Sequence, residues 1–191
     1  MRTVTARLLS PVCLLLLVAC AGARPAEPRG ASPAPSASTV VLLVRHAEKA
    51  TEGGDDPALT PAGRQRAEVL VQVAQHAGVS AISATRLRRT RETAQPLADR
   101  LGVPITVREV IPGGGRAQAA QQARDLLTQH RGQVVLVVGH SNTLPLVAEA
   151  LAGVPIPPIP DSEYDRLMVV VVPPSGPARL IQSRYGAPSA P

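Results

Sequence analysis

Two histidines of this chain directly follow apolar runs and stand beside other side chains that could do chemistry. His46 comes soon after the run at residues 39–44, and His140 after the run at residues 133–138. Their polar neighbours in the sequence are Arg45, Glu48, Ser141 and Asn142. Val/Leu runs of this length are typical of strands buried on both faces, and ligands bind beyond the carboxyl ends of such strands. We therefore expect the two histidines to share one site at an edge of the sheet.

An arginine-rich segment lies where a predicted strand gives way to a helix. Its four guanidinium groups belong to Arg86, Arg88, Arg89 and Arg91. A guanidinium binds phosphate through two parallel hydrogen bonds, and the first turn of a helix adds backbone donors for an anion. Phosphoryl transfer depends mainly on positioning and charge stabilisation, and a histidine can be its covalent nucleophile. The combination favours a phosphoryl pocket.

A metal site is the competing use of the same residues. His46, Glu48 and His140 could together ligate zinc, although Arg45 would then put a positive charge beside the cation. The other two histidines, His76 and His130, each come two residues before a glycine in the last turn of a predicted helix. An imidazolium interacts well with the helix dipole there, so we interpret both as structural or solvated.

The remaining elements predict a three-layer α/β/α sandwich with a mostly parallel central sheet, because strands and helices alternate with short connections. Strands are predicted at residues 39–45, 79–84, 105–109, 133–138, 167–172 and 178–184. Helices are predicted at residues 60–77, 86–101, 116–130 and 142–152, the first with Thr60 as its cap and Pro61 in its first turn. The domain would cover residues 39–185, and residues 186–191 would be a tail.

Four blocks of this sequence, in order, resemble the histidine phosphatase superfamily, which has the phosphoglycerate-mutase-like fold. They are residues 43–48 (LVRHAE), 59–63 (LTPAG), 86–94 (RLRRTRETA) and 137–142 (VVGHSN). The resemblance covers about residues 39–153, and residues 163–167 also look like small phosphatase-only members. One such block is weak as a signal, whereas four in order are specific.

The resemblance implies a role for each matched residue. His46 would attack the phosphoryl group and carry it as phosphohistidine, Arg45 and Arg89 would bind phosphate oxygens, and His140 would complete the pocket. Water would then hydrolyse the intermediate, with no metal or other cofactor. Glu109 matches the position of the family's acid; the backups for this role are Asp56 and Glu48.

The chain also departs from the family pattern. Thr85-Arg86 replaces the usual Ser-Pro, so Arg86 either adds a substrate contact or points outward. The residues after Glu109 lack the family's usual motif. We expect the substrate to be bound additionally by Glu48, Arg86, Ser141 and Asn142.

The first 38 residues indicate export. Residues 1–20 have a basic start and an apolar core that is too short to span a bilayer as a mature helix. Residues 17–20 (LVAC) resemble a lipobox, which predicts a lipoprotein signal with Cys20 as the lipidated residue; cleavage near Ala23 is the alternative. Residues 21–38 are rich in Pro, Ala and Ser and predict a disordered linker.

Composition argues against nucleic acid as a partner. The chain has 191 residues and a formal charge of +6, but its basic residues are scattered, and Tyr164 and Tyr185 are its only aromatic side chains besides histidine.

From the leader, the motifs and the composition together, we expect an exported, lipid-anchored phosphatase for a small phosphorylated substrate. A phosphate-binding module without turnover and a metal-dependent hydrolase remain the alternatives, and the sequence predicts no particular oligomeric state.

Overall fold

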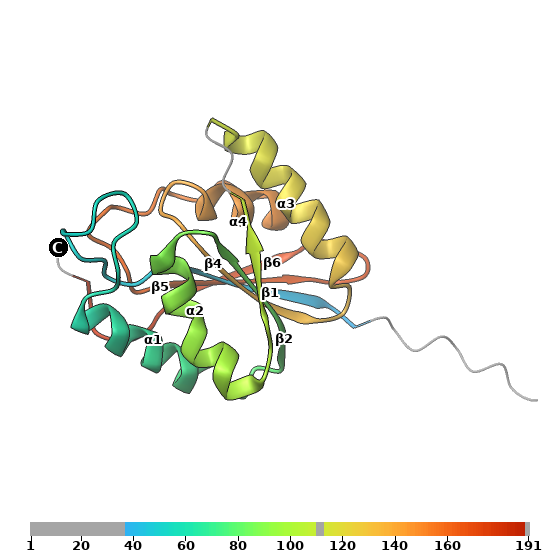
Figure 1. The fold of residues 1–191 in the computed structure, drawn as a ribbon. Helices are drawn as coiled ribbons and strands as arrows, with labels where there is room; N and C mark the ends of the chain where they lie inside the picture. Colours follow the sequence, from blue (N-terminus) through green and yellow to red (C-terminus); the bar gives the residue numbers. More distant parts are fainter. Residues whose placement is uncertain (1–36, 110–112, 190–191) are drawn as a thin grey trace, which may run out of the picture. The chain divides into compact units, whose positions relative to one another are not determined.

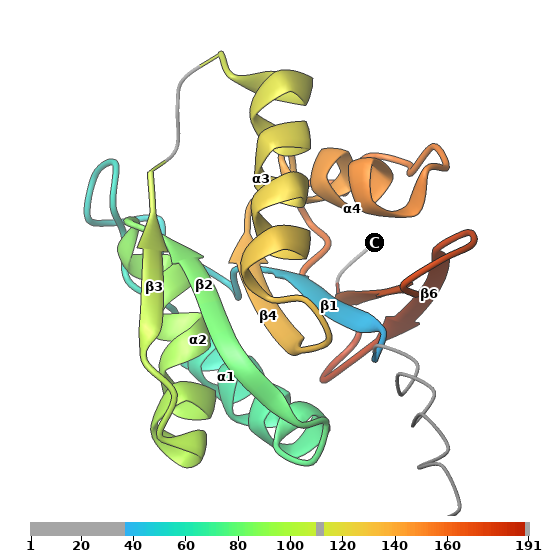
Figure 2. The ribbon, with the colours of Figure 1, turned by 90° about the vertical axis from the view of Figure 1, so that its right-hand side faces the viewer.

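The computed structural model describes residues 37–109 and 113–189, which form one mixed sheet between two pairs of helices (Figures 1 and 2). The strands are β1 (Thr39–Arg45), β2 (Val79–Thr85), β3 (Ile105–Arg108), β4 (Val134–Gly139), β5 (Arg166–Val172) and β6 (Arg179–Arg184). The helices are α1 (Pro61–Ala74), α2 (Arg88–Leu101), α3 (Gly115–Gln129) and α4 (Leu144–Ala152). The predicted leader with Cys20, and the predicted linker up to residue 36, lie outside the described residues. None of the helices described is both long and apolar enough to cross a membrane.

The sheet has the order β3-β2-β4-β1-β5-β6. The strands β3, β2, β4 and β1 are mutually parallel, whereas β5 pairs antiparallel with both β1 and β6. The parallel register of β1 and β4 sets Arg45 opposite Gly139, and the amide of His46 donates to the Gly139 carbonyl at 2.9 Å. This register carries both histidines to the same edge of the sheet, as the sequence predicts.

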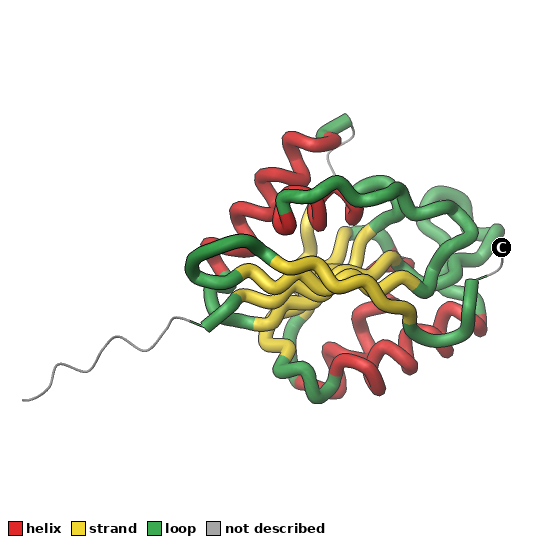
Figure 3. Tube along the Cα trace, turned by 180° about the vertical axis from the view of Figure 1, so that it is seen from behind, coloured by secondary structure: helices red, strands yellow, loops and turns green. Residues whose placement is uncertain are grey.

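The helices cover the two faces of the sheet in pairs, as the view from behind shows (Figure 3). Helices α1 and α2 pack on one face around Leu70, Ile82 and Leu97, while α3 and α4 pack on the other around Leu43 and Leu126. The predicted three-layer architecture is confirmed, and its core is aliphatic throughout apart from the buried ring of Tyr185.

The two ends of the loop between β1 and α1 pair with each other, and the loop packs tightly against the start of α1. An isolated antiparallel bridge joins Lys49 to Leu59, and Thr60 caps α1 by accepting a hydrogen bond from the Gly63 amide at 3.0 Å. A Cβ on Gly63 would lie 2.2 Å from the carbonyl oxygen of Glu48. The glycine of the LTPAG block is therefore required by the close approach of two backbone segments.

Two predicted helix ends differ from the structure. Helix α1 stops at Ala74, so His76 lies in the turn that follows it rather than in its last turn. Helix α3 ends at Gln129, and His130 is its C-cap residue. In both cases the α-helix ends before the residue predicted from the position of the next glycine, and the residues just before that glycine form a turn instead.

Candidate active site

The imidazole of His46 is held by a hydrogen bond to the backbone that fixes its tautomer. His46 directly follows β1 and is buried, with 3% of its surface exposed. Its Nδ1 lies 2.8 Å from the carbonyl oxygen of Ala47. A carbonyl only accepts, so Nδ1 carries the proton and Nε2 keeps its lone pair. Burial, opposed by this hydrogen bond and assisted by the charge of Arg45, lowers the pKa of His46 to about 3. The imidazole is therefore neutral near pH 7.

His140 lies against His46. The two ring centroids are 5.5 Å apart with an interplanar angle of 62°, and the Nε2 of His140 lies 3.1 Å from the hydroxyl of Thr85 at the end of β2. Burial, together with the charges of Arg89 and Arg45, lowers the pKa of His140 to about 4. Three adjacent parallel strands thus contribute to one site through the residues at their carboxyl ends.

Arg45 is buried beside the histidine pair and is enclosed by the segment that precedes β5. Its Nη1 lies 2.8–2.9 Å from the carbonyl oxygens of Pro160, Asp161 and Glu163. The ring of Tyr164 covers the guanidinium, with 4.2 Å between its centroid and Cζ. The Nε of Arg45 is buried and has no hydrogen-bond acceptor among the described residues.

Arg89, in the first turn of α2, brings a second guanidinium to the site. Its Nη1 donates to the carbonyl of Asp55 at 3.3 Å, and its Nε is also buried without an acceptor in the described part of the chain. Thr93 links this turn to the residue after His46, since its hydroxyl donates to the Arg89 carbonyl and accepts from the Ala47 amide. Two unpaired guanidinium donors beside a neutral imidazole form an arrangement suited to an oxyanion.

Glu48 was predicted to bind substrate, but its carboxylate is engaged elsewhere. Both of its oxygens accept from the buried Arg66 on α1, through Nε at 3.0 and 3.1 Å and Nη2 at 2.7 Å. Burial by itself would raise the pKa of Glu48; the hydrogen bonds from Arg66 outweigh this effect and the pKa is lowered. This arrangement gives no support to a contact between Glu48 and substrate, and Arg66 is the partner that sequence reasoning missed.

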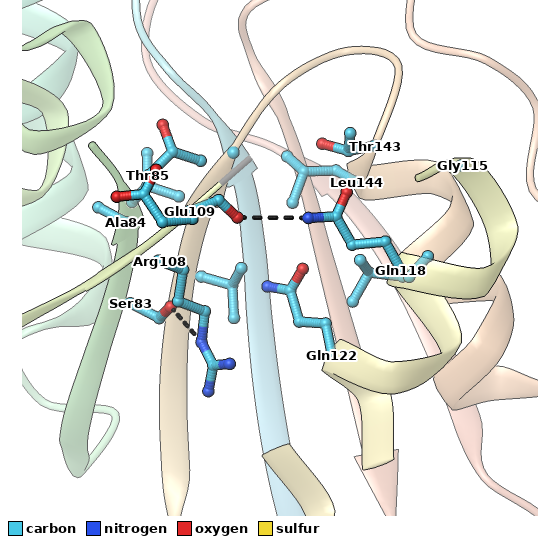
Figure 4. Close-up of a pocket in the computed structure, with 15 residues that line it drawn as sticks. Ser83, Ala84, Thr85, Arg108, Glu109, Gly115, Gln118, Gln122, Thr143 and Leu144 are labelled. Carbon is cyan, nitrogen blue, oxygen red and sulfur yellow. Dashed lines mark hydrogen bonds between the residues drawn. The ribbon is translucent and has the colours of Figure 1, made fainter. Parts of the chain in front are cut away.

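Glu109 and Arg86 lie at the rim of the site. Their side chains are 74% and 64% exposed and form an ion pair at 3.4 Å, so Arg86 points outward, one of its two predicted orientations. Glu109 lines a cavity between the ends of β2 and β3 and the start of α3, in which its carbonyl accepts from Gln118 (Figure 4). Thr85 lines the same cavity, so the cavity adjoins the histidine pair, although neither histidine lines it.

The remaining predicted residues follow β4 or lie in the loop before α1. Ser141 lies 3.3 Å from the carboxylate of Asp161, and Asn142 is exposed. Asp56 accepts from the Arg88 amide at 2.6 Å and so caps the start of α2.

One residue of the site carried no chemical signal in the sequence. Tyr164 lies 6.0 Å from His46, centroid to centroid, and stacks on Arg45. The only available clues were the rarity of aromatic residues in this chain and the resemblance of residues 163–167 to small phosphatases. In residues 37–109 and 113–189, no three His, Cys, Asp or Glu side chains gather as potential metal ligands.

Comparisons with known proteins bear on the family resemblance and on the fold. A family model of the histidine phosphatase superfamily (branch 1) matches residues 41–111. No curated protein sequence is significantly similar to the chain. Among solved structures, the protein histidine phosphatase SixA complexed with tungstate is 19% identical with a TM-score of 0.61, covering 76% of this chain and 96% of that one.

Two further structures share the fold. A protein assigned as the phosphohistidine phosphatase SixA of Agrobacterium tumefaciens is 24% identical with a TM-score of 0.56, covering 81% of this chain and 99% of that one. A mycobacterial glucosyl-3-phosphoglycerate phosphatase is 15% identical with a TM-score of 0.58, covering 75% and 97%. The match of the family model to residues 41–111 and the shared fold agree with the resemblance to the histidine phosphatase superfamily that the four sequence blocks indicated.

Proposed function

We propose that the chain is a phosphatase that hydrolyses phosphomonoesters through a phosphohistidine intermediate on His46. The observation that carries the proposal is the neutral imidazole of His46 beside the unpaired Nε donors of Arg45 and Arg89. The Nδ1 of this imidazole is hydrogen-bonded to the carbonyl oxygen of Ala47. Nucleophile and anion-binding groups are thereby assembled before substrate arrives, which is the preorganisation that phosphoryl transfer requires.

The first step is attack of the His46 Nε2 lone pair on phosphorus, with departure of the ester oxygen and its electron pair. Arg45 and Arg89 neutralise the charge on the phosphoryl oxygens, and His140 borders them. Glu109 is the proposed proton donor to the leaving oxygen: its ion pair with Arg86 opens, the freed carboxylate takes up a proton from solvent, and it passes that proton to the oxygen. Attack of water on the phosphohistidine then releases phosphate and restores the imidazole.

Phosphohistidine in a protein is a second candidate substrate, favoured by the exposed position of Glu109. A phosphorylated imidazole whose other nitrogen is protonated leaves as neutral imidazole, so the enzyme need not supply a proton. An alkoxide leaving group needs an acid close by. The structures described as phosphohistidine phosphatases among the neighbours motivate including this class.

The test of the proposal is hydrolysis of an aryl phosphate in the presence of a chelator. Wild type is compared with His46→Ala and with His76→Ala, the latter because His76 is exposed in the turn after α1. Turnover that is lost in the first variant and kept in the second supports the proposal. Binding of phosphate without turnover favours the non-catalytic module, and activity abolished by the chelator favours the metal-dependent hydrolase. Turnover that persists in His46→Ala refutes His46 as the nucleophile.

We further propose that the protein is exported and lipid-anchored through Cys20, which favours phosphoesters outside the cytoplasm as substrates. The support is the sequence of residues 1–20 alone. The test is fractionation of cells that produce wild type or Cys20→Ser. Membrane association of the wild type that is lost in the variant supports the anchor, whereas a wild type found in the cytosol overturns both export and the substrate location.

A further inference from the structure

The end of the Arg45 side chain is clamped by the segment that precedes β5. Three backbone carbonyls within residues 160–163 accept from the single atom Nη1, those of Pro160, Asp161 and Glu163. The nearest carboxylate, that of Asp161, is 3.8 Å away from Nη2 and 97% exposed, so it compensates the buried charge weakly. The electrostatic environment of Arg45 therefore depends on carbonyl dipoles and on whatever covers the face of the guanidinium.

That face is covered by Tyr164. The distance of 4.2 Å from Cζ to the ring centroid is within the range of a cation–π interaction, and the partly buried setting strengthens it. The same ring lies 6.0 Å from the ring of His46, centroid to centroid. With Nη1 fixed by carbonyls and one face fixed by the ring, the guanidinium retains Nε as a donor for an anion.

Tyr164 is in turn held from the end of the described chain. The hydroxyl of Ser189 accepts from the amides of Tyr164 at 2.7 Å and Asp165 at 3.2 Å, and the Ser189 amide donates to the Asp165 carboxylate at 3.3 Å. Residues 186–189, predicted as a tail beyond the domain, therefore contact the segment that orients Arg45. The buried Arg66 also binds this stretch, through the Ala187 carbonyl at 2.9 Å.

We propose that Tyr164 is a positioning residue, which fixes the guanidinium of Arg45 for binding the phosphoryl group, and that Ser189 holds Tyr164 in place. The inference deepens the proposed function and rests on it, since the ligand of Arg45 is the phosphoryl group. Tyr164 acts through the π face of its ring, and its hydroxyl is dispensable.

The experiment measures the binding of inorganic phosphate by calorimetry and the turnover of an aryl phosphate for three proteins. These are wild type, Tyr164→Phe and Tyr164→Leu, the last keeping apolar bulk without a π face. Without the ring the guanidinium must be ordered when phosphate binds, and the affinity lost in this way is at most the strength of the cation–π interaction, about fivefold to thirtyfold. We expect that loss in Tyr164→Leu and a Kd within about twofold of wild type in Tyr164→Phe.

Tyr185→Phe is the matched control, because the hydroxyl of this buried tyrosine has no partner among the described residues. Equal phosphate affinity of Tyr164→Leu and wild type overturns the inference. A Tyr164→Phe as weak as Tyr164→Leu also overturns it, because the hydroxyl would then be the active group. A wild type that binds no phosphate and shows no turnover refutes the proposed function itself, which is a distinguishable result.

The role of Ser189 is tested in the same assays with Ser189→Ala against Ser183→Ala. Ser183 is exposed on β6 and makes no side-chain hydrogen bond in the described structure. We expect severalfold weaker phosphate binding in Ser189→Ala, rescue in Ser189→Thr, and no change in Ser183→Ala. Unchanged binding in Ser189→Ala refutes the contribution of this residue and leaves the test of Tyr164 independent.

Discussion

Replacing Glu48 by glutamine separates a structural role of this residue from a role in binding substrate. Glu48 belongs to the block that resembles the family signature, which predicts a contact with substrate. In the structure, its carboxylate instead neutralises Arg66, whose side chain is 3% exposed. The substitution keeps the shape of the side chain but removes its charge and puts an NH2 group where the guanidinium needs an acceptor. We expect a loss of stability, with the activity of the folded protein unchanged.

The size of the loss follows from what remains around Arg66. Stranding a fully buried charge costs about 3–5 kcal/mol, and a hydrogen bond to a charged group contributes about 1.5–3 kcal/mol. Arg66 still donates to the carbonyls of Tyr185 and Ala187, at 2.8 and 2.9 Å, and Glu48 is 24% exposed. We therefore expect a decrease of about 2–3 kcal/mol in the free energy of unfolding. For a chain of this length the corresponding decrease in Tm is about 4–12 °C.

The assay is thermal unfolding at several pH values, with Glu68→Gln as the control because Glu68 is exposed on the same helix. The pKa of Glu48 is lowered in the folded protein, so its stabilising effect is complete above the unfolded pKa of about 4.3 and is lost as pH falls through the folded pKa. The difference in Tm between wild type and Glu48→Gln is thus full at pH 7 and shrinks below about pH 4. An unchanged Tm at pH 7 with a raised KM would refute this reasoning and restore Glu48 as a substrate-binding residue.

Two further predictions concern the same edge of the sheet. Gly63→Ala places a Cβ 2.2 Å from the Glu48 carbonyl, so we expect it to lower the free energy of unfolding by more than about 3 kcal/mol, measured by denaturant titration; an unaltered midpoint would mean that α1 can move away from β1 at little cost. The imidazoles of His46 and His140, with pKa values lowered to about 3 and about 4, should stay neutral from pH 8 down to pH 5. Their ring proton resonances, assigned with His46→Ala, should not shift over that range, and a titration near pH 6.5 in the free protein would contradict the burial argument.

The strands that carry the histidines could be predicted because their signal is local. A continuous apolar run is unambiguous when it ends in a polar residue, and the runs ending near His46 and His140 are β1 and β4. The parallel direction of those strands follows from the helices between them, and it places both histidines at the same edge of the sheet. The direct pairing of β1 with β4 is known only from the structure, because β2 and β3 lie between these strands in the chain.

The contacts that orient the site could not be predicted, because they join residues that are far apart in the chain and have ordinary local contexts. Arg66 lies on α1, whose sequence is typical of an amphipathic surface helix. No residue near Arg66 in the sequence indicates that its side chain pairs with Glu48. Three strands, β2, β3 and β4, lie between Arg45 and Tyr164 in the chain, and the contact of these two residues depends on β5 pairing antiparallel with β1.

That pairing explains why the later part of the chain matters for the chemistry. Because β5 runs antiparallel to β1, the residues just before β5 arrive at the carboxyl end of β1, where Arg45 and His46 lie. A parallel β5 would have delivered them to the opposite edge of the sheet. The direction of one strand thus brings Tyr164 to Arg45, the arginine that we propose binds phosphate. Substitutions at the β1–β5 contact should therefore displace Arg45 more than His140, whose strand pairs with β1 from the other side.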